Sequence, residues 1–235
     1  MQVLPQAKIL EVFRSIQGEG PYAGLPQVFV RFFECNMHCV WCDTPASIGD
    51  TSRNYKEVPL EDLFAQVQGL YDGCHSVSIT GGEPLMQKDF LKTFLPQLRQ
   101  AGMKVYLDTN GTLPRELAEL IDHIDIVAMD IKLPSSTQQK AFWHEHEEFL
   151  RIARRKEVFV KVVISQDTSD GDMREAVELV RRVDPGITLI LQPNYFDMRA
   201  TGGCVAKCVE AQKYCSKFLD DVRIIPQMHK YMKLR

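Results

Sequence analysis

The chain has no long hydrophobic run and no excess of charge of one sign. No apolar segment approaches the roughly 18 residues that a membrane helix needs, and the start MQVLPQAKIL lacks the apolar stretch of a secretory signal. Lysine and arginine number 28 against 31 aspartate and glutamate, a net charge of -3, so no overall positive field attracts nucleic acid. We therefore expect a cytoplasmic protein that binds neither membranes nor nucleic acids.

Low-complexity stretches, long glycine–serine linkers and short-period repeats are also lacking. Nothing in the 235 residues therefore marks a domain boundary. With 45% hydrophobic and 25% charged residues, the composition is typical of a globular protein with a substantial core. We expect one domain over residues 1–235.

Short β-branched runs alternate with segments of helical period along most of the chain. The runs predicted as strands are 27–33, 76–80, 103–108, 125–130, 157–164, 187–192 and 221–226. The segments predicted as helices are 60–71, 88–101, 113–122, 135–156, 171–183 and 203–219. Nearly continuous apolar strands between helices are typical of a parallel sheet covered by helices. We expect an α/β fold, a partial (β/α)6-type TIM-like barrel, with ligands at the carboxyl ends of its strands.

Three of the seven cysteines lie within eight residues. The first predicted strand runs into Cys35, Cys39 and Cys42, spaced C-x3-C-x2-C, with Trp41 before the last. Because the cytosol disfavours disulfides, thiol chemistry or metal binding is the better explanation. Three thiolates can hold three irons of a [4Fe-4S] cluster and leave the fourth iron open to a substrate or cofactor. The alternative is a tetrahedral zinc site with His38 as the fourth ligand.

This triplet, with its aromatic residue, resembles the signature of the radical S-adenosylmethionine (SAM) superfamily. A second element of that superfamily, Gly-Gly-Glu-Pro at a strand end, is matched by Gly81, Gly82, Glu83 and Pro84. The resemblance implies a partial or complete β/α barrel, a [4Fe-4S] cluster bound by a loop at about 34–58, and SAM chelated to the open iron. In that superfamily an electron from the cluster cleaves SAM to methionine and a 5′-deoxyadenosyl radical.

Four further segments look like those of the 7-carboxy-7-deazaguanine synthases. They are SIQGEG at 15–20, FVR at 29–31, CDT at 42–44 and PQMHK at 226–230. The resemblance implies conversion of 6-carboxy-5,6,7,8-tetrahydropterin to 7-carboxy-7-deazaguanine with loss of ammonia, a lyase reaction of 7-deazapurine (queuosine-type) biosynthesis. It also implies a homodimer, Mg²⁺ as a further cofactor, and an electron donor such as a flavodoxin or ferredoxin.

The same resemblance assigns roles on the substrate side. Arg31 matches an arginine that holds the substrate carboxylate; the alternative, a surface ion pair, is disfavoured by the apolar run around it. Gln17 and Glu19 match a loop that contacts the pterin, with a plain turn as the alternative. Thr44 matches a Mg²⁺ ligand, with a loop-capping hydroxyl as the alternative. The other residues expected at the substrate are Thr80, Gln227 and His229, the last two closing the pocket together with the loop 45–58.

Residues at other strand ends are expected to contact SAM. DTNGT at 108–112 and DIK at 130–132 depart from the usual synthase pattern and instead resemble the glycyl-radical-enzyme activases, another short radical SAM family. The substrate-side segments favour the synthase, and the activase stays an alternative. A zinc-binding β/α module without enzymatic activity is the alternative from a different class. The SAM contacts expected from the resemblance are Trp41, Gly81, Gly82, Glu83, Asp108, Thr109, Asn110, Lys132 and Gln192.

The other cysteines and one charged segment have simpler explanations. Cys204, Cys208 and Cys215 share one face of a predicted helix. Buried thiols are the common explanation for such a set, and an auxiliary cluster is the alternative. Cys74 is isolated and is expected to pack against apolar neighbours. The charged stretch 144–156 is expected to be a solvated helix face.

Overall fold

A computed structural model describes residues 5–49, 54–200 and 203–234. The strands are β1 Gln6–Ile16, β2 Pro26–Phe32, β3 Lys56–Pro59, β4 Ser76–Gly81, β5 Val105–Thr109, β6 Ile126–Asp130, β7 Glu157–Ile164, β8 Leu189–Pro193 and β9 Val222–Ile224. The α-helices are α1 Leu60–Leu70, α2 Lys88–Gln100, α3 Pro114–Leu120, α4 Pro134–Thr137, α5 Trp143–Ala153, α6 Asp170–Val183, α7 Tyr195–Ala200, α8 Gly203–Cys215 and α9 Met228–Met232. Short 3₁₀ turns cover Gly20–Tyr22, Pro45–Ser47, Pro84–Gln87 and Ile121–His123.

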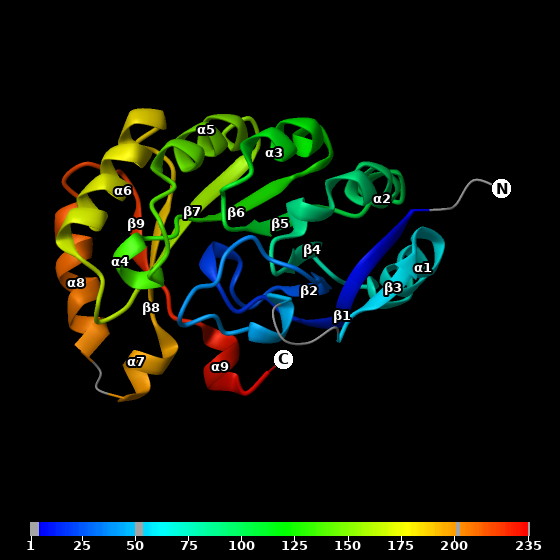
Figure 1. Ribbon diagram of the computed structural model, residues 1–235, viewed down its shortest axis with the longest axis horizontal. Coiled ribbons are helices and arrows are strands. Elements are labelled where there is room, and N and C mark those ends of the chain that lie inside the picture. Colours follow the sequence, from blue (N-terminus) through cyan, green and yellow to red (C-terminus); the bar gives the residue numbers. More distant parts are fainter. Residues whose placement is uncertain (1–4, 50–53, 201–202, 235) are drawn as a thin grey trace.

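The strands form one curved sheet in the order β3-β1-β2-β4-β5-β6-β7-β8-β9. From β2 to β9 each strand runs parallel to its neighbour, and the helices α2, α3, α5, α6 and α8 form an arc around the outside (Figure 1). Within the described residues β3 and β9 are free edges, so the barrel is open. This confirms the predicted α/β fold and partial barrel. β7 has the predicted bounds, because residues 159–164 are all buried and the apolar run is uninterrupted except for Lys161.

The N-terminal edge of the sheet differs from the prediction. β1 pairs antiparallel with both β2 and β3, and neither β1 nor β3 was predicted. The register of β1 shifts between Ile9 and Glu11, and such a bulge turns the following side chains to the other face. Before the shift, Ala7 and Ile9 enter the helix-covered core; after it, Glu11 and Phe13 line the interior cavity. The alternation of core-facing residues therefore reverses in the middle of β1, so the sequence shows no continuous strand pattern there.

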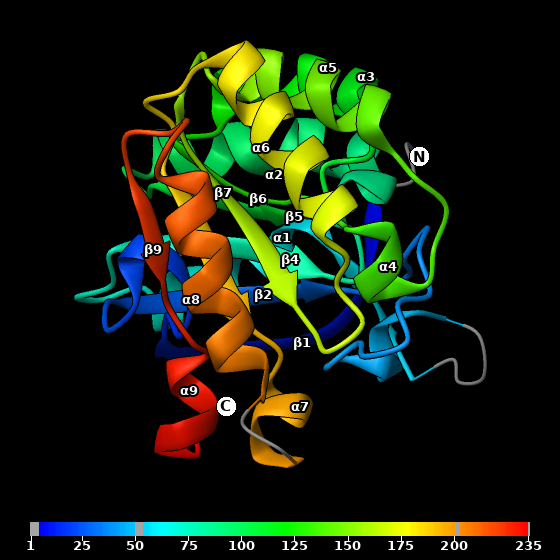
Figure 2. The same cartoon turned by 90° about the vertical axis from the view of Figure 1, so that its left-hand side faces the viewer.

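The helix predicted at 135–156 is in fact two helices. α4 ends before Gln138, whose φ of 56° is left-handed and cannot continue a helix. α5 then buries His146, Phe149 and Leu150 on one side. The expectation of a solvated face is therefore wrong for that side of α5, although its charged residues do face outward. The short helices α7 and α9 were not predicted; they lie side by side (Figures 1 and 2).

The main core lies between the sheet and its outer helices. Cys208 and Cys215 belong to it, and Cys204 is also fully buried. The Cys204 thiol donates to the Asn194 carbonyl at 3.6 Å, and burial raises the pKa values of Cys208 and Cys215 to about 12. These features support buried thiols rather than an auxiliary cluster. No helix in the described part of the chain is long and apolar enough to cross a membrane.

Candidate active site

Polar side chains form a layer at the carboxyl ends of the parallel strands. Each lies two residues beyond a side chain of a small apolar core inside the barrel. Side chains two apart on a strand point to the same face, so the apolar core is the floor on which the polar layer rests. The pairs are Tyr106 and Asp108 on β5, Ala128 and Asp130 on β6, Phe159 and Lys161 on β7, and Ile190 and Gln192 on β8.

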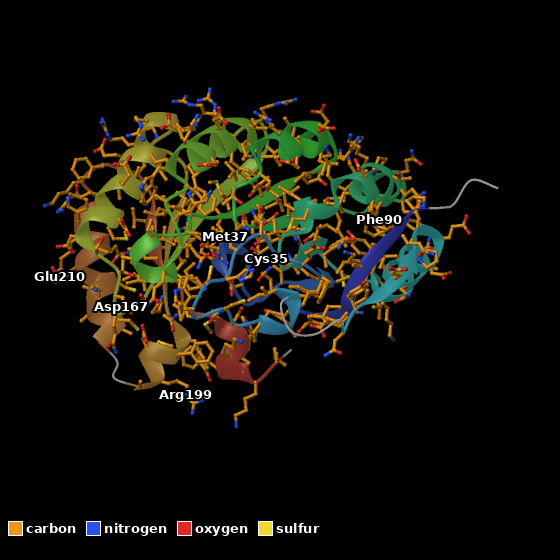
Figure 3. The ribbon with its side chains drawn as sticks, viewed as in Figure 1. Cys35, Met37, Phe90, Asp167, Arg199 and Glu210 are labelled. Atoms are coloured by element: carbon orange, nitrogen blue, oxygen red, sulfur yellow. The ribbon has the colours of Figure 1, made fainter. Side chains whose placement is uncertain are left out.

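Above this floor lies a cavity of about 400 Å³, a volume within the usual range for small-molecule sites. Figure 3 shows Cys35 near the centre of the molecule, among the strand ends that surround this space. Every site residue expected from the sequence lines the cavity except Glu83. Those that do are Gln17, Glu19, Arg31, Cys35, Cys39, Trp41, Cys42, Thr44, Thr80, Gly81, Gly82, Asp108, Thr109, Asn110, Lys132, Gln192, Gln227 and His229.

The three thiols of the C-x3-C-x2-C motif line one wall of the cavity. Burial raises the pKa of Cys35 to about 11 and also raises those of Cys39 and Cys42. A bound metal removes this penalty because it favours the thiolate form. His38 is exposed and does not line the cavity, so it is not placed as the fourth ligand that the zinc alternative needs. Three thiols around one cavity fit a [4Fe-4S] cluster with one open iron.

The cluster loop is fixed to α4 through Trp41. Its indole nitrogen donates to the Ser136 carbonyl at 2.6 Å and lies 3.0 Å from the Ser136 hydroxyl. The Lys132 ammonium lies 5.2 Å from the centre of the indole ring, a cation–π contact. Gln139 adds a bond from its amide to the His38 carbonyl at 2.9 Å. The indole is thus an anchor of the loop as well as part of the cavity wall.

The two glycines after β4 let this loop lie against the sheet. Gly81 has a φ of +131°, and a Cβ there would lie 2.1 Å from the Phe32 carbonyl oxygen. A Cβ on Gly82 would lie 2.2 Å from the Glu34 carbonyl oxygen and 2.8 Å from that of Ser47. Both approaches are closer than any real Cβ contact. The close approach that these two glycines permit is therefore made to the backbone that carries the cysteines.

Glu83 is fully buried and joins the ends of β4 and β5. Its carboxylate accepts hydrogen bonds from the Leu85 amide at 3.1 Å, the Thr109 hydroxyl at 2.9 Å and the Asn110 amide at 2.8 Å. Burial raises the pKa of Glu83 to about 7 in spite of these donors. Glu83 does not line the cavity, so the SAM contact expected from the resemblance stays a prediction.

A buried ionic network occupies the polar layer. Lys161 forms a short ion pair with Glu19 and lies 3.8 Å from both Asp108 and Asp130. Lys132 pairs with Asp130 at 2.8 Å. Burial favours the neutral amine of Lys161, but the three carboxylates outweigh it and raise its pKa well above the ordinary value. Burial also opposes ionisation of Glu19, and Lys161 nevertheless holds the pKa of that carboxyl below its usual range.

Lys161 was not predicted as a site residue, although the sequence carries a signal for it. It is the one charged residue between Val158 and Ile164 in an otherwise apolar strand. The same argument led to Arg31 in the run VFVRFF. A charged side chain in the middle of a buried strand must have ionic partners, and here they are Glu19 of the 15–20 segment and the acids at the ends of β5 and β6.

The C-terminal segment closes the cavity over the QGEG loop. The Gln227 amide donates to Glu19 at 2.7 Å and to Asp43 at 3.0 Å, and the Met228 amide donates to the Gly18 carbonyl at 2.8 Å. His229 packs so closely on Gly18 that a Cβ there would lie 2.1 Å from its Nδ1. Asp43 was part of the quoted CDT segment but was given no role. The loop 45–58 also contributes, through Ser47 and Ile48, while its residues 50–53 lie outside the described residues.

Arg31 is ion-paired, yet it faces the cavity rather than the surface. Its Nε donates to Glu11 at 2.8 Å, with both side chains mostly buried. One terminal nitrogen lies 3.5 Å from the Thr44 hydroxyl, which in turn donates to Asp43 at 3.2 Å. The ion pair is thus present, but it lies at the cavity and not on the surface. Arg31 lines the cavity, and its contact with a substrate carboxylate stays a prediction.

Gln17 and Thr80 are bonded mainly within the protein. The Gln17 amide oxygen accepts from the Glu19 backbone at 3.0 Å, and its nitrogen donates to Gln27 at 2.9 Å. The Thr80 hydroxyl donates to Asp108 at 3.1 Å. Gln17 therefore shapes the loop that presents Glu19, and Thr80 orients an acid of the polar layer.

Two buried oxygen atoms beside the cavity have no hydrogen-bond partner among the described residues. They are Oδ1 of Asp130 and Oε1 of Gln192. Buried acceptors in proteins are almost always satisfied, so these two atoms indicate that a bound molecule supplies donors here. Both residues line the cavity together with Lys132.

Comparison with known proteins agrees with this geometry. Residues 30–180 match the family model of the Radical SAM superfamily. The chain therefore belongs to the radical SAM superfamily, and membership implies a [4Fe-4S] cluster and SAM as cofactors. The three cavity thiols and the unsatisfied acceptors fit these two groups.

Curated relatives resolve the family further. The 7-carboxy-7-deazaguanine synthase of Geobacter sulfurreducens is 40% identical, with 97% of this chain and 98% of the relative covered. That of Thermoplasma acidophilum is 38% identical, with 94% and 95% covered. Within the superfamily, the chain belongs to the 7-carboxy-7-deazaguanine synthases.

Solved structures show the same fold at lower sequence identity. The crystal structure of QueE from Escherichia coli matches with a TM-score of 0.64 and 24% identity, covering 95% of each chain. A structure of TYW1 with a lysine-pyruvate adduct bound matches with a TM-score of 0.59 and 15% identity, covering 82% of this chain and 74% of that one.

Proposed function

We propose that the protein is a lyase that converts 6-carboxy-5,6,7,8-tetrahydropterin to 7-carboxy-7-deazaguanine with loss of ammonia. The observation that carries the proposal is one cavity lined by three thiols and also by Arg31 and the Glu19–Gln227 pair. A guanidinium suits a carboxylate, and a carboxylate beside an amide suits the mixed donor and acceptor edge of a pterin. We also propose the cytoplasm as its location, a homodimer, and a flavodoxin or ferredoxin as electron donor, all from the family.

On the cysteine side of the cavity, Cys35, Cys39 and Cys42 would hold the cluster. When bound, the cluster would supply the electron for reductive cleavage of SAM and so the radical chemistry needed at C6 of the pterin. The chain's own contribution is to orient and seclude the reactants. Asp130, Lys132 and Gln192 line the SAM wall, with Trp41 anchoring the loop between that wall and the cluster.

On the substrate side of the cavity, ionised groups would hold the pterin. Lys161 keeps Glu19 charged, so this carboxylate can accept two hydrogen bonds from the amino-pyrimidine edge. The terminal nitrogens of Arg31 would bind the substrate carboxylate while Glu11 holds Nε. The docking of Gln227 and His229 on the QGEG loop excludes water from the radical step.

Thr44 is the proposed contact for Mg²⁺. Its hydroxyl lies between Arg31 and Asp43, near the place where the substrate carboxylate would bind. Mg²⁺ usually keeps several waters and takes few protein ligands. One hydroxyl together with substrate oxygens therefore fits this cation better than a cage of carboxylates. Glu19, Asp43 and His229 do lie close together, but Lys161 and Lys230 already balance their charge.

The test is direct product analysis of the reconstituted enzyme. The protein is loaded anaerobically with iron and sulfide and given SAM, a reductant, Mg²⁺ and 6-carboxytetrahydropterin, and both 5′-deoxyadenosine and 7-carboxy-7-deazaguanine are measured by mass spectrometry. Both products are expected. Deoxyadenosine alone would overturn the proposed substrate. The search would then turn to a protein partner of the kind that glycyl-radical-enzyme activases act on, because the DTNGT and DIK segments resemble that family. Neither product with an intact cluster would overturn the proposed reaction.

A substitution separates the substrate side from the cluster side. Arg31→Ala should keep the cluster and SAM cleavage but strongly impair turnover of the carboxylated pterin. The control is Arg151→Ala, which removes an exposed ion pair on α5 and should change neither. Unchanged kinetics in Arg31→Ala would remove the proposed carboxylate contact.

A further inference from the structure

Asn110, at the end of β5, has every polar group bonded within the protein. Its backbone amide donates to Glu83 at 2.8 Å, and its carbonyl lies 3.1 Å from Nε2 of the buried His146. Its side-chain oxygen accepts from the amide of Thr112 at 3.1 Å and from the hydroxyl of Thr112 at 2.6 Å. Its side-chain nitrogen donates to Asn36 at 2.8 Å. Few residues in a loop are held at so many points, and the side chain is almost fully buried.

These bonds fix which way the amide of Asn110 points. The backbone nitrogen of Thr112 can only donate, so the atom that it meets must be Oδ1 of Asn110. Nδ2 is therefore the atom on the opposite side, toward the cysteine loop. It carries two hydrogens, and Asn36 takes only one of them.

The second hydrogen is directed at a cysteine of the cluster motif. Nδ2 of Asn110 lies 4.0 Å from Sγ of Cys35, at the long end of the range for a hydrogen bond to sulfur. Asn36 belongs to the same loop as Cys35 and donates back to the Thr112 hydroxyl at 2.8 Å. Asn36, Asn110 and Thr112 thus form a closed ring of bonds between the cysteine loop and the end of β5.

We propose that Asn110 is a positioning residue that donates an N–H···S hydrogen bond to the Cys35 thiolate and thereby raises the reduction potential of the cluster. Reduction adds one electron to the cluster, supplied by a one-electron protein donor or by dithionite, and increases the negative charge on its thiolates. A hydrogen bond to a thiolate stabilises the more negative state. The DTNGT departure from the usual synthase pattern is then a feature of cluster tuning and not of substrate choice.

His146 completes the arrangement from the core side. Among the described residues its Nδ1 has no partner, and its bond to the Asn110 carbonyl requires the hydrogen on Nε2. The imidazole lies against Gly111, where a Cβ would lie 3.3 Å from its Cδ2. His146 therefore restrains the backbone of the loop, whereas the Asn110 side chain approaches the thiol, beside the hydrogen bond from the Met37 backbone amide.

The test measures the midpoint potential of the cluster, not turnover. Anaerobically reconstituted protein without SAM is titrated with a chemical reductant, and the reduced cluster is followed by electron paramagnetic resonance. Asn110→Leu, of similar volume but without the amide, should lower the ratio of reduced to oxidised cluster about tenfold at a fixed potential, equivalent to about 59 mV for one electron. Thr112→Val is the matched control: it breaks two bonds of the same ring but leaves Nδ2 in place, and it should not shift the potential.

An unchanged potential in Asn110→Leu would overturn the proposal, as would an equal shift in Thr112→Val. If the leucine variant does not load iron, Asn110→Asp at pH 8 replaces it, since its carboxylate still accepts from Thr112. Both proteins, exchanged into deuterium oxide, should show a deuteron coupling from the Met37 backbone amide at Cys35. The wild type should show a further deuteron coupling to the reduced cluster in pulsed resonance that Asn110→Asp lacks. Identical couplings in both proteins would also overturn the proposal.

Discussion

The two walls of the cavity differ in their predominant side chains. The cysteine wall is held mainly by neutral groups, the amide of Asn110, the indole of Trp41 and the bare backbone at Gly82, with the Lys132 ammonium over the indole. The ionic wall holds Lys161 among carboxylates. A cluster with bound SAM brings its own charges and needs a rigid seat, whereas a polar substrate is recognised by fixed charges. The difference predicts that each wall can be damaged while the other stays intact.

The largest expected effect comes from the cysteine wall. Cys42→Ala removes one of three ligands, so the reconstituted variant should lose the cluster and all SAM cleavage. Cys208→Ala is the control, because that thiol is buried in the core of α8, and it should keep about four irons per chain at a cost of about 1 kcal/mol in stability. Iron analysis and deoxyadenosine formation check both. Full activity in Cys42→Ala would contradict the assignment of the cluster.

The second-largest effect is expected from Gly82→Ala, which leaves all three cysteine ligands unchanged. The added methyl group would meet the carbonyl oxygens of Glu34 and Ser47, and neither backbone segment can move without carrying the cysteine loop along. We expect a loss of about 4 kcal/mol in stability and of most cluster loading. Gly69→Ala in the exposed part of α1, where nothing lies near the new atom, should instead stabilise by about 0.5–1 kcal/mol. Equal cluster loading in Gly82→Ala and Gly69→Ala would show that the close backbone approach at Gly82 is unimportant for the cluster.

On the ionic wall, Lys161→Met should separate pterin turnover from cluster binding. Removing the ammonium leaves Glu19 and Asp108 without this cation. Asp130 keeps its pair with Lys132. Breaking a buried pair such as Lys161–Glu19 costs about 3–5 kcal/mol. Pterin turnover should fall by at least about a hundredfold, while iron content and the cluster spectrum stay normal. The control Lys213→Met removes an exposed pair with Glu210 on α8 and should be nearly neutral. Loss of the cluster in Lys161→Met would contradict the independence of the two walls.

Much of the fold was predictable because strands buried on both faces are apolar throughout. β7 is the best example, and the helices between such strands follow from their own period. β1 was missed because its bulge reverses the inward-facing positions between Ile9 and Glu11. α7 and α9 were missed because five or six residues are too few to show a helical period.

The cavity-lining residues were largely predictable, but their partners were not. Motifs pointed to Gly82 and Glu83, yet only the packing shows that they seat the loop and join two strands. Lys161 and Asp43 carry charge at positions that no quoted motif assigned. Their significance depends on which acids and amides the barrel brings beside them, and those come from strands far apart in sequence.

The smallest expected effect concerns Glu83, a carboxyl group that is neutral, like most of the cysteine wall, only if it is protonated. Burial raises its pKa from 4.5 to about 7, so in the folded state it binds its proton more tightly than in the unfolded state. Its contribution to stability is therefore fully present below about pH 4.5 and is lost as the pH rises through 7, by up to about 3 kcal/mol. His146 acts in the opposite direction in an overlapping window, because burial lowers its pKa to about 4 and stability then rises with pH until about 6.5.

The two contributions are separated by comparing variants of the cluster-free protein. Glu83→Gln cannot ionise, so its stability should keep the rise due to His146 and lose the fall between pH 4.5 and 7. Urea unfolding at several pH values measures both curves. Parallel curves for Glu83→Gln and the wild type would mean that the donors from Leu85, Thr109 and Asn110 outweigh burial and keep the carboxylate charged. The cysteine wall would then include a buried anion, and it would differ from the ionic wall only in how much charge it holds.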